Sequence, residues 1–205
     1  INKMVRIRPF KAIRPTRDKA NLVASRSYLS YSDETLKEKL EHNPFTFLHI
    51  INPDYTYEVK LKGVEKYKAV KEKFKKFKDD GYLITEGSES FYIYQQTHGK
   101  HTYVGIIGAT SVCDYLNGNI KRHEHTITSK KEMFKEYLES TGFNAEPVLL
   151  CYKENKTITA IIKKHQSTRA EYEFSTTNKV VHKLWLVNSI SEIKKIMNAF
   201  DTINN

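Results

Sequence analysis

The sequence predicts an α+β fold, with a mixed, mainly antiparallel sheet and helices interleaved between its strands. Segments with helical spacing of apolar residues alternate irregularly with short strand-like runs, which argues against a strictly alternating parallel sheet. Hydrophobic residues make up 39% of the chain and aromatic residues 12%, enough to bury a core. A length of 205 residues fits one large domain or two small ones. Without an internal repeat or a low-complexity segment, we expect a single α+β region over residues 1–205.

The first quarter of the chain is expected to hold an extended segment, a helix and a strand. Residues 5–13 are expected to form a short extended segment. One reason is that a proline disfavours the helical region for the residue before it, here Arg8 before Pro9. Ser32 is a suitable N-cap for a helix that ends near Asn43-Pro44. The compact apolar run Phe45–Ile51 predicts a strand, followed by a turn.

The middle of the chain predicts a long helix and a pair of strands. Lys60–Lys78 has apolar residues at steps of three and four, and Gly81 is a good left-handed C-cap. The apolar residues of this helix are Tyr67, Val70, Phe74 and Phe77. Phe91–Gln96 and Thr102–Ile107 predict two paired strands, and His98-Gly99 between them suggests a hairpin turn.

The remaining elements follow from capping boxes and apolar runs. Ser129 with Glu132, and Ser189 with Glu192, are capping boxes that open helices. The other predicted elements, in chain order, are the end of the first of these helices at Gly142, a strand over Pro147–Tyr152, a helix over Thr157–His165 and a strand over Val180–Val187. His49 is expected to be a hydrogen-bonded core histidine, and Trp185 a core residue.

The formal net charge of +10 is concentrated in two blocks. Residues 60–80 hold nine Lys against four acidic residues, and most of these lysines fall on the solvated face of the predicted helix. Residues 1–19 hold seven Lys and Arg against one acidic residue, and this block is led by arginine. Arginine offers a planar fork for phosphate or carboxylate, so Arg8 and Arg14 become candidate anion ligands.

The densest polar cluster runs from Asn119 to Thr126, between a glycine-containing turn and a helix N-terminus. Backbone N–H groups at a helix start, together with Lys121 and Arg122, suit phosphate or carboxylate. On an extended segment His123 and His125 would point to one side and Glu124 to the other, an arrangement suited to proton transfer. Two histidines are weak evidence for a metal without a third ligand, so no metal site is predicted. The alternative is a charged loop whose groups pair with each other and with solvent.

Several function classes lack support in the sequence. Gly105-Ile106-Ile107-Gly108 is not a dinucleotide fingerprint and indicates close packing or a bulge instead. The serines lack the glycine elbow of serine hydrolases. Cys113 and Cys151 fit a reducing compartment, and with no apolar run near 20 residues and no leader pattern we expect a cytoplasmic protein without a membrane span.

Taken together, the motifs resemble an uncharacterised bacterial and archaeal family, the domain-of-unknown-function family 1015. The likeness spans essentially the whole chain. The stretches that carry it are Ile7-Arg8-Pro9-Phe10-Lys11-Ala12-Ile13-Arg14-Pro15, Ala24-Ser25-Arg26-Ser27-Tyr28, Asn43-Pro44-Phe45-Thr46-Phe47-Leu48, Tyr92-Ile93-Tyr94-Gln95-Gln96, Gly105-Ile106-Ile107-Gly108, Ile120-Lys121-Arg122-His123-Glu124-His125-Thr126, Ala145-Glu146-Pro147-Val148 and His182-Lys183-Leu184-Trp185.

The chain departs from the family pattern in two places. Where the family commonly has Pro-Tyr-Asp-Val, this sequence reads Ser27-Tyr28-Leu29-Ser30, so a carboxylate is missing. Family members are also about twice as long, and their Ala-Asp-Gly-His-His-Arg motif would begin about where this sequence stops. The resemblance therefore implies an N-terminal half that is inactive alone.

The resemblance also implies a chemistry, because the family's later motif is similar to the phosphate-binding signature of the ParB/sulfiredoxin-like superfamily. It implies phosphoryl transfer or phosphate-ester hydrolysis on a small metabolite: serine, phosphoserine or a nucleotide with Mg²⁺. The expected catalytic residues are His123, Glu124 and His125, and the expected phosphate ligands are Arg8, Arg14, Lys121, Arg122 and Thr126. The alternatives are a nucleic-acid-binding module of ParB-like ancestry and a structural half that supports a site elsewhere; the oligomeric state stays open.

Overall fold

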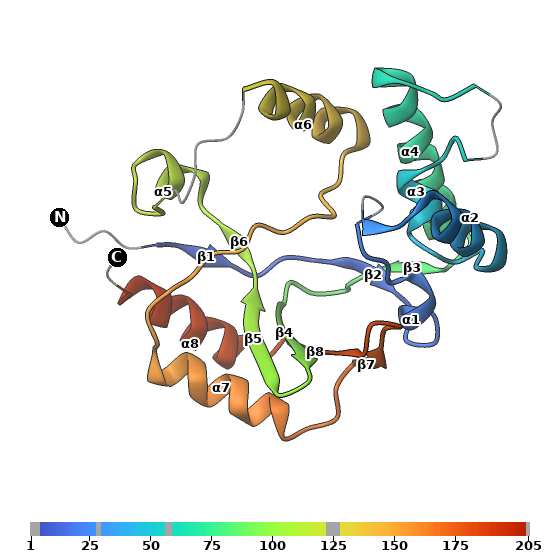
Figure 1. Cartoon of the computed structure of the whole chain (residues 1–205). Coiled ribbons are helices and arrows are strands. Elements are labelled where there is room, and N and C mark those ends of the chain that lie inside the picture. The colour runs from blue at the N-terminus through green and yellow to red at the C-terminus, as the bar shows by residue number, and fades with distance from the viewer. Residues whose placement is uncertain (1–4, 28–29, 56–58, 122–127, 204–205) are drawn as a thin grey trace. The chain divides into compact units, whose positions relative to one another are not determined.

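The computed structural model describes residues 5–27, 30–55, 59–121 and 128–203, and it confirms the α+β class (Figure 1). The chain separates into two compact units, each assembled from segments far apart in sequence. The first unit consists of residues 1–13, 85–125 and 147–205, and the second of residues 14–84 and 126–146.

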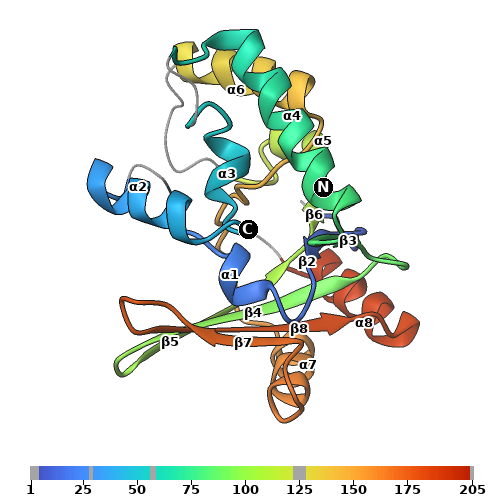
Figure 2. The same ribbon diagram turned by 90° about the vertical axis from the view of Figure 1, so that its right-hand side faces the viewer.

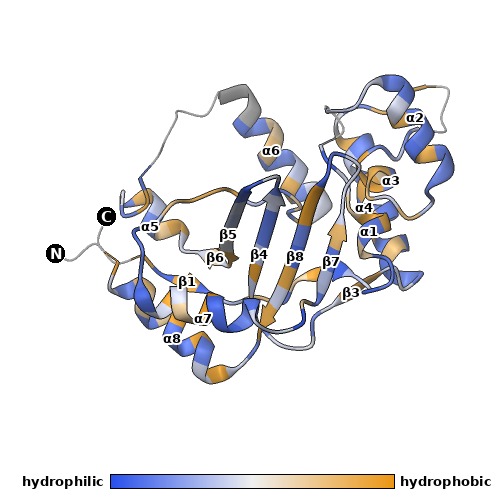
Figure 3. Cartoon of the chain, turned by 60° about the horizontal axis from the view of Figure 1, so that its bottom comes forward, coloured by the Kyte–Doolittle hydropathy of each residue, from blue (hydrophilic) through white to orange (hydrophobic). Residues whose placement is uncertain are grey.

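The first unit is organised around a four-stranded sheet in the order β5-β4-β8-β7, visible in Figure 3, with antiparallel neighbours throughout. Its strands are β4 (Phe91–His98), β5 (His101–Ile107), β7 (Tyr172–Ser175) and β8 (Val180–Val187). The predicted pair of strands and the predicted strand near the C-terminus are therefore confirmed. Gly99 sits in the turn between β4 and β5 with a φ of 58°, a conformation that glycine adopts without strain.

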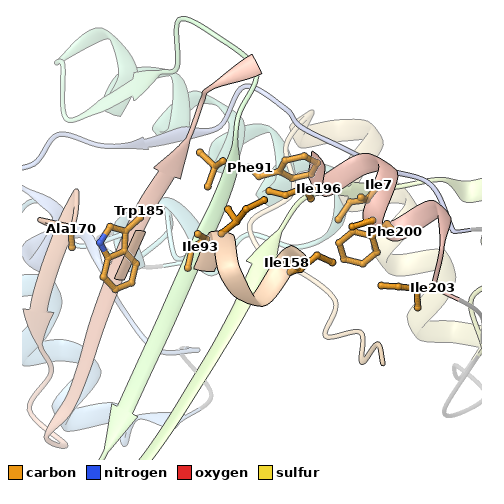
Figure 4. Close-up of a cluster of buried hydrophobic side chains, with 12 residues drawn as sticks. Ile7, Phe91, Ile93, Ile158, Ala170, Trp185, Ile196, Phe200 and Ile203 are labelled. Atoms are coloured by element: carbon orange, nitrogen blue, oxygen red, sulfur yellow. The ribbon is translucent and has the colours of Figure 1, made fainter. Parts of the chain in front are cut away.

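The helices α7 (Lys156–Gln166) and α8 (Ile190–Asp201) lie against one face of this sheet, as Figure 2 shows. Phe91 is paired with Val187 and Ile93 with Trp185, so these four side chains share the face that meets the helices. Figure 4 shows them packed with the apolar side of both helices. The helix residues in this core are Ile158, Ile161, Ile196, Ala199 and Phe200. Trp185 is only 4% exposed, which confirms its predicted place in the core.

The first unit also contains a short antiparallel pair of strands. β1 (Ile7–Arg8) runs antiparallel to β6 (Ala109–Thr110), and α5 (Val112–Leu116) follows directly. A Cβ atom on Gly108 would lie 2.8 Å from both Ile7 Cδ1 and Phe91 Cε1. The prediction of close packing at this glycine is therefore confirmed, and only glycine lets β1 approach the core here.

The second unit is mainly helical. Its elements are α1 (Ala20–Val23), α2 (Asp33–His42), α3 (Leu48–Ile51), α4 (Gly63–Asp79), α6 (Thr128–Thr141) and the strand pair β2 (Ile13–Pro15) with β3 (Leu83–Thr85). Two predicted caps are confirmed, because Ser32 Oγ accepts from the Thr35 N–H at 3.3 Å and Gly81 has a φ of 75° after α4. Gly142 likewise has a φ of 74° at the end of α6. The predicted cap at Ser129 falls on a side chain outside the described residues.

Aromatic rings join the helices of the second unit. Phe74 of α4 stacks on Phe143 with ring centroids 4.0 Å apart, and Tyr67 meets Tyr137 of α6 edge-on at 5.4 Å. The fully buried apolar core beneath them is small: Val23, Ile50, Val70, Phe77 and Leu83. The lysines of α4 are mostly exposed, as its apolar spacing predicts.

Two predicted strands are wrong. Phe45–Ile51 forms a turn and then α3, because the buried Thr46 starts a helical turn: the His49 N–H bonds to its carbonyl at 3.1 Å. His49 is nevertheless hydrogen-bonded, through Nε2 to the Asn43 carbonyl at 3.1 Å. Residues 147–152 lie outside any helix or strand, with Leu149 89% exposed. An apolar run thus needs a neighbouring strand edge before it becomes a strand.

The predicted capping box at Ser189 and Glu192 is also wrong. Within the described residues, the Ser189 side chain accepts no capping hydrogen bond from α8. The Glu192 carboxylate points elsewhere, to Lys164 Nζ at 2.7 Å and His165 Nε2 at 3.0 Å on α7. A side chain with charged partners on a packed helix gains more from them than from one backbone N–H.

Candidate functional site

The arginine-led N-terminal strand meets the segment that leads to the predicted anion cluster. Arg8 of β1 pairs with Ala109 of β6, a hundred residues later in sequence. The Ser111 N–H continues this contact by donating to the Arg6 carbonyl at 3.2 Å. The fold thereby fixes two predicted elements of the site, the N-terminal strand and the start of the polar segment, within one unit.

The Asp114 carboxylate holds β1 to α5 and to the segment that follows α5 through hydrogen bonds. It is 3% exposed, and its Oδ2 accepts from the Arg6 backbone N–H at 2.9 Å and from Arg6 Nε at 3.4 Å. Its Oδ1 accepts from Asn119 Nδ2 at 3.2 Å. The Arg6 backbone N–H, with help from Asn119 and the guanidinium, holds the pKa of Asp114 below its usual value despite burial. Asp114 is therefore an ionised structural carboxylate rather than a proton donor at neutral pH.

Lys121 projects from the end of this fixed segment. The Ile120 N–H donates to the Asp114 carbonyl at 3.0 Å, and the Ile120 side chain is 8% exposed, so the backbone is anchored up to this residue. Lys121 itself is exposed, as is Arg8 on β1. Among the described residues, neither cation has an ion pair or side-chain hydrogen bond, in contrast to Arg6.

The other predicted site residues lie either outside the described residues or in the second unit. Arg122, His123, Glu124, His125 and Thr126 lie outside the described residues. Arg14 belongs to β2 in the second unit, where its Nη1 donates to the Pro15 carbonyl at 3.4 Å. The role of Arg14 as a phosphate ligand of the same site as Lys121 therefore stays a prediction.

Sequence reasoning missed the role of Glu192 in joining the two helices of the first unit. This carboxylate is 8% exposed and lies between Lys164 and His165. The hydrogen bond from Lys164, followed by that from His165, lowers the pKa of Glu192. Lys164 and His165 both belong to α7, so Glu192 attaches α8 to α7.

A second missed group lies on the opposite face of the sheet. Tyr94 Oη and His182 Nδ1 are 2.7 Å apart, and the His182 ring stacks on Phe174 with centroids 5.1 Å apart. Burial lowers the pKa of His182, which favours the neutral ring. The sequence offered no signal for this cluster, because its members come from three different strands.

The described residues contain no group of three or more His, Cys, Asp or Glu side chains that could hold a metal ion. A surface hollow beside α6 is lined by Glu132, Glu136 and Glu139 with two other residues of that helix, which makes it an exposed helix face. Cys113 and Cys151 are free and exposed. No helix in the part of the chain described is long and apolar enough to span a membrane.

Comparison with known proteins gives one match. No curated protein and no solved structure matches the chain. The likeness to the ParB/sulfiredoxin-like superfamily accordingly stays a prediction. A family model described as Protein of unknown function (DUF1015) matches residues 7–205, so this chain belongs to that family.

Proposed function

We propose that this protein binds a small phosphorylated metabolite and catalyses phosphoryl transfer or phosphate-ester hydrolysis at the junction of β1, β6 and α5. The observation that carries the proposal is the set of hydrogen bonds to the Asp114 carboxylate. They hold strand β1, which contains Arg8 and directly follows Arg6, beside the segment that leads to Lys121. Such chemistry depends mainly on positioning and charge stabilisation, so a rigid frame for cations is its main requirement.

The three cations of the junction, Arg6, Arg8 and Lys121, have different roles in the proposed site. Arg6 is held by Asp114 and by Ser111 Oγ, at 3.2 Å from its Nη2, so it serves the frame. Arg8 and Lys121 extend from the same frame and have no ion-pair partner among the described residues. They are therefore the cations available to phosphate oxygens, Arg8 through its planar fork and Lys121 as a point charge.

The proposal assigns the remaining steps to the segment that follows Lys121. Arg122 and Thr126 would add phosphate ligands, and His123, Glu124 or His125 would orient or deprotonate the acceptor. With a nucleotide substrate, Mg²⁺ would be held mainly by phosphate oxygens and water. The substrates to test first are phosphoserine, and serine with ATP or ADP.

An assay of phosphate release and phosphoserine formation tests the function. The protein is assayed in the length its gene encodes and as the 205-residue chain, with Arg8→Ala, Lys121→Ala and the double variant His123→Ala/Glu124→Ala. Lys11→Ala, an exposed cation of the same N-terminal segment, is the matched control. We expect the double variant to lose about 10²-fold or more in rate, as removal of a general base does.

Two outcomes separate the alternatives. An unchanged rate in the double variant would remove the assignment of His123 and Glu124. If the gene encodes a longer protein, activity in that protein but not in the 205-residue chain would favour a supporting role for this region, with the chemistry completed elsewhere.

A further inference from the structure

Helix α5 carries an apolar face beside the proposed phosphate site. Val112 is 70% exposed and Leu116 is 68% exposed, and their spacing of four residues places them on the same side of the helix. Tyr115, which is 40% exposed, lies on that side as well, three residues after Val112. Asp114 is buried and accepts hydrogen bonds from the neighbouring segments. The helix is therefore attached to its neighbours through Asp114, and its exposed side is mainly apolar.

Arg8 projects to the same side of β1 as the arginine that contacts α5. Successive side chains of a strand point to opposite faces, so Arg6 and Arg8 share one face, while Ile7 between them is buried on the other. Arg6 Nε lies 3.4 Å from Asp114 Oδ2, and Arg6 Nη2 lies 3.2 Å from Ser111 Oγ, so this face is the one beside α5. Arg8 therefore lies on the α5 side of the strand pair.

The turn after α5 brings Lys121 back beside the helix. Gly118 has a φ of 73°, and its N–H donates to the Tyr115 carbonyl at 3.2 Å. The Ile120 N–H then donates to the Asp114 carbonyl at 3.0 Å, so the residue before Lys121 is attached to the middle of α5. Lys121, which is exposed, therefore stays close to α5.

The segments that build the junction contain a single acidic residue. Among residues 5–13 and 101–121 this residue is Asp114, whose carboxylate is buried and already bonded to donors of the protein. The ammonium group of phosphoserine would find no other carboxylate on these segments, and it would lie near the like charges of Arg8 and Lys121. An amino-acid phosphate therefore matches this surface only through its phosphate group.

We propose that the ligand of this junction is a nucleotide, whose phosphate lies between Arg8 and Lys121 and whose base packs on Val112 and Leu116 of α5. The inference rests on the proposed function and names its ligand class. A nucleobase is flat and uncharged, so it can cover exposed apolar side chains, while the phosphate is complementary in charge to the two cations. Of the substrates named above, the nucleotide rather than phosphoserine or serine is thus assigned to the junction.

Nuclear magnetic resonance titrations that follow the methyl groups of Val112 and Leu116 test where the base binds. Adenosine monophosphate, ribose phosphate and inorganic phosphate are added separately to the 205-residue chain. We expect saturable shifts of both side chains with adenosine monophosphate and only small shifts with the two probes that lack a base. The methyl groups of Val64, a valine of α4 that is 44% exposed, are the control and should not shift.

Calorimetric titrations measure the contribution of the base to affinity. Adenosine monophosphate should bind about tenfold more tightly than ribose phosphate or phosphoserine, which corresponds to the burial of roughly 50 Å² of apolar surface. The double variant Val112→Ser/Leu116→Ser should remove most of this difference and should bind inorganic phosphate like the wild type. Both side chains are largely exposed, so the variant should fold, and Val64→Ser is the matched control that keeps the difference.

The outcomes separate this inference from the proposed function. Equal affinity for adenosine monophosphate and ribose phosphate, or an unchanged difference in the double variant, would overturn the inference and leave the phosphate site standing. Failure of every phosphorylated probe and of inorganic phosphate to bind would remove the proposed site, and the inference with it. Adenosine monophosphate should also lose affinity in Arg8→Ala/Lys121→Ala, and unchanged affinity there would show that the nucleotide binds elsewhere.

Discussion

The two units of this chain are held together by different means. The first unit has a continuous apolar core between a four-stranded sheet and two helices, with Phe91, Ile93, Ile158 and Ile196 fully or almost fully buried. The second unit joins its helices mainly through half-buried rings around a small buried core. The Asp114 junction, the candidate anion site, lies on the first unit. Binding groups thus sit on the more extensively buried scaffold, where they can be held rigidly.

The sharpest test of this difference compares one large side chain from each unit. Phe91→Ala should cost about 3–5 kcal/mol, because it leaves a cavity in a fully buried core. Phe74→Ala, which removes a half-buried ring stacked on Phe143, should cost roughly 2 kcal/mol. Amide hydrogen exchange should show loss of protection throughout the first unit for Phe91→Ala and only in the second unit for Phe74→Ala. A uniform loss in both variants would mean that the units are not separate.

Substitution of Asp114, at the junction of β1, β6 and α5, should give the next largest loss of stability. Asp114→Ala should cost roughly 2–3 kcal/mol, because the Arg6 and Asn119 donors lose a charged acceptor. Since folding lowers the pKa of Asp114, this stabilisation is present above its unfolded value, near 3.9, and disappears as the pH falls through the lower folded value. Denaturant titrations of wild type and variant should converge as the pH falls from about 4 through the lower, folded-state pKa of Asp114. A difference that stays constant over this range would contradict the ionised state of Asp114.

The sequence predicts those parts of the fold that depend on contacts between residues close together in the chain. Capping residues and apolar periodicity placed α2, α4, α7 and the β4–β5 hairpin correctly, because these signals are local. The apolar runs at 45–51 and 147–152 were assigned to strands without any information about a partner edge. Glu192 was assigned to a cap because sequence spacing cannot reveal a buried partner on another helix.

The candidate sites show the same limit more strongly. The pairing of Arg8 with Ala109 and the contact of Arg6 with Asp114 join segments about a hundred residues apart. The cluster of Tyr94, His182 and Phe174 takes one residue from each of three strands, so no single stretch of the sequence contains it. Such sites become visible only when strand order and register are known.

Two glycines provide a finer comparison between the units. Gly108→Ala should cost about 1–3 kcal/mol, because its Cβ would overlap Ile7 and Phe91 in the first unit. Gly105→Ala, which has open space around its Cβ position, is the control and should change stability little. Thermal unfolding monitored by circular dichroism measures both. Equal effects at the two positions would show that the β1 approach is not tight.

Gly81→Ala should have the smallest effect, about 1 kcal/mol, because space is open but the φ of 75° is unfavourable for a residue with a Cβ. The loss should be confined to α4 and its neighbours in the second unit, as seen by hydrogen exchange. Gly81→Asn is the matched variant and should recover part of the loss, since Asn tolerates this conformation better. No recovery would point to a cause other than the backbone angle.

The central claim is that the junction of β1, β6 and α5 binds phosphate. The most direct test is titration with inorganic phosphate and with phosphoserine, followed through the backbone amide resonances of Arg8, Thr110 and Lys121 and of control residues in α4. We expect saturable shifts confined to the junction, which disappear in the double variant Arg8→Ala/Lys121→Ala and persist in Lys11→Ala. Shifts spread over α4, or unchanged binding in the double variant, would contradict it.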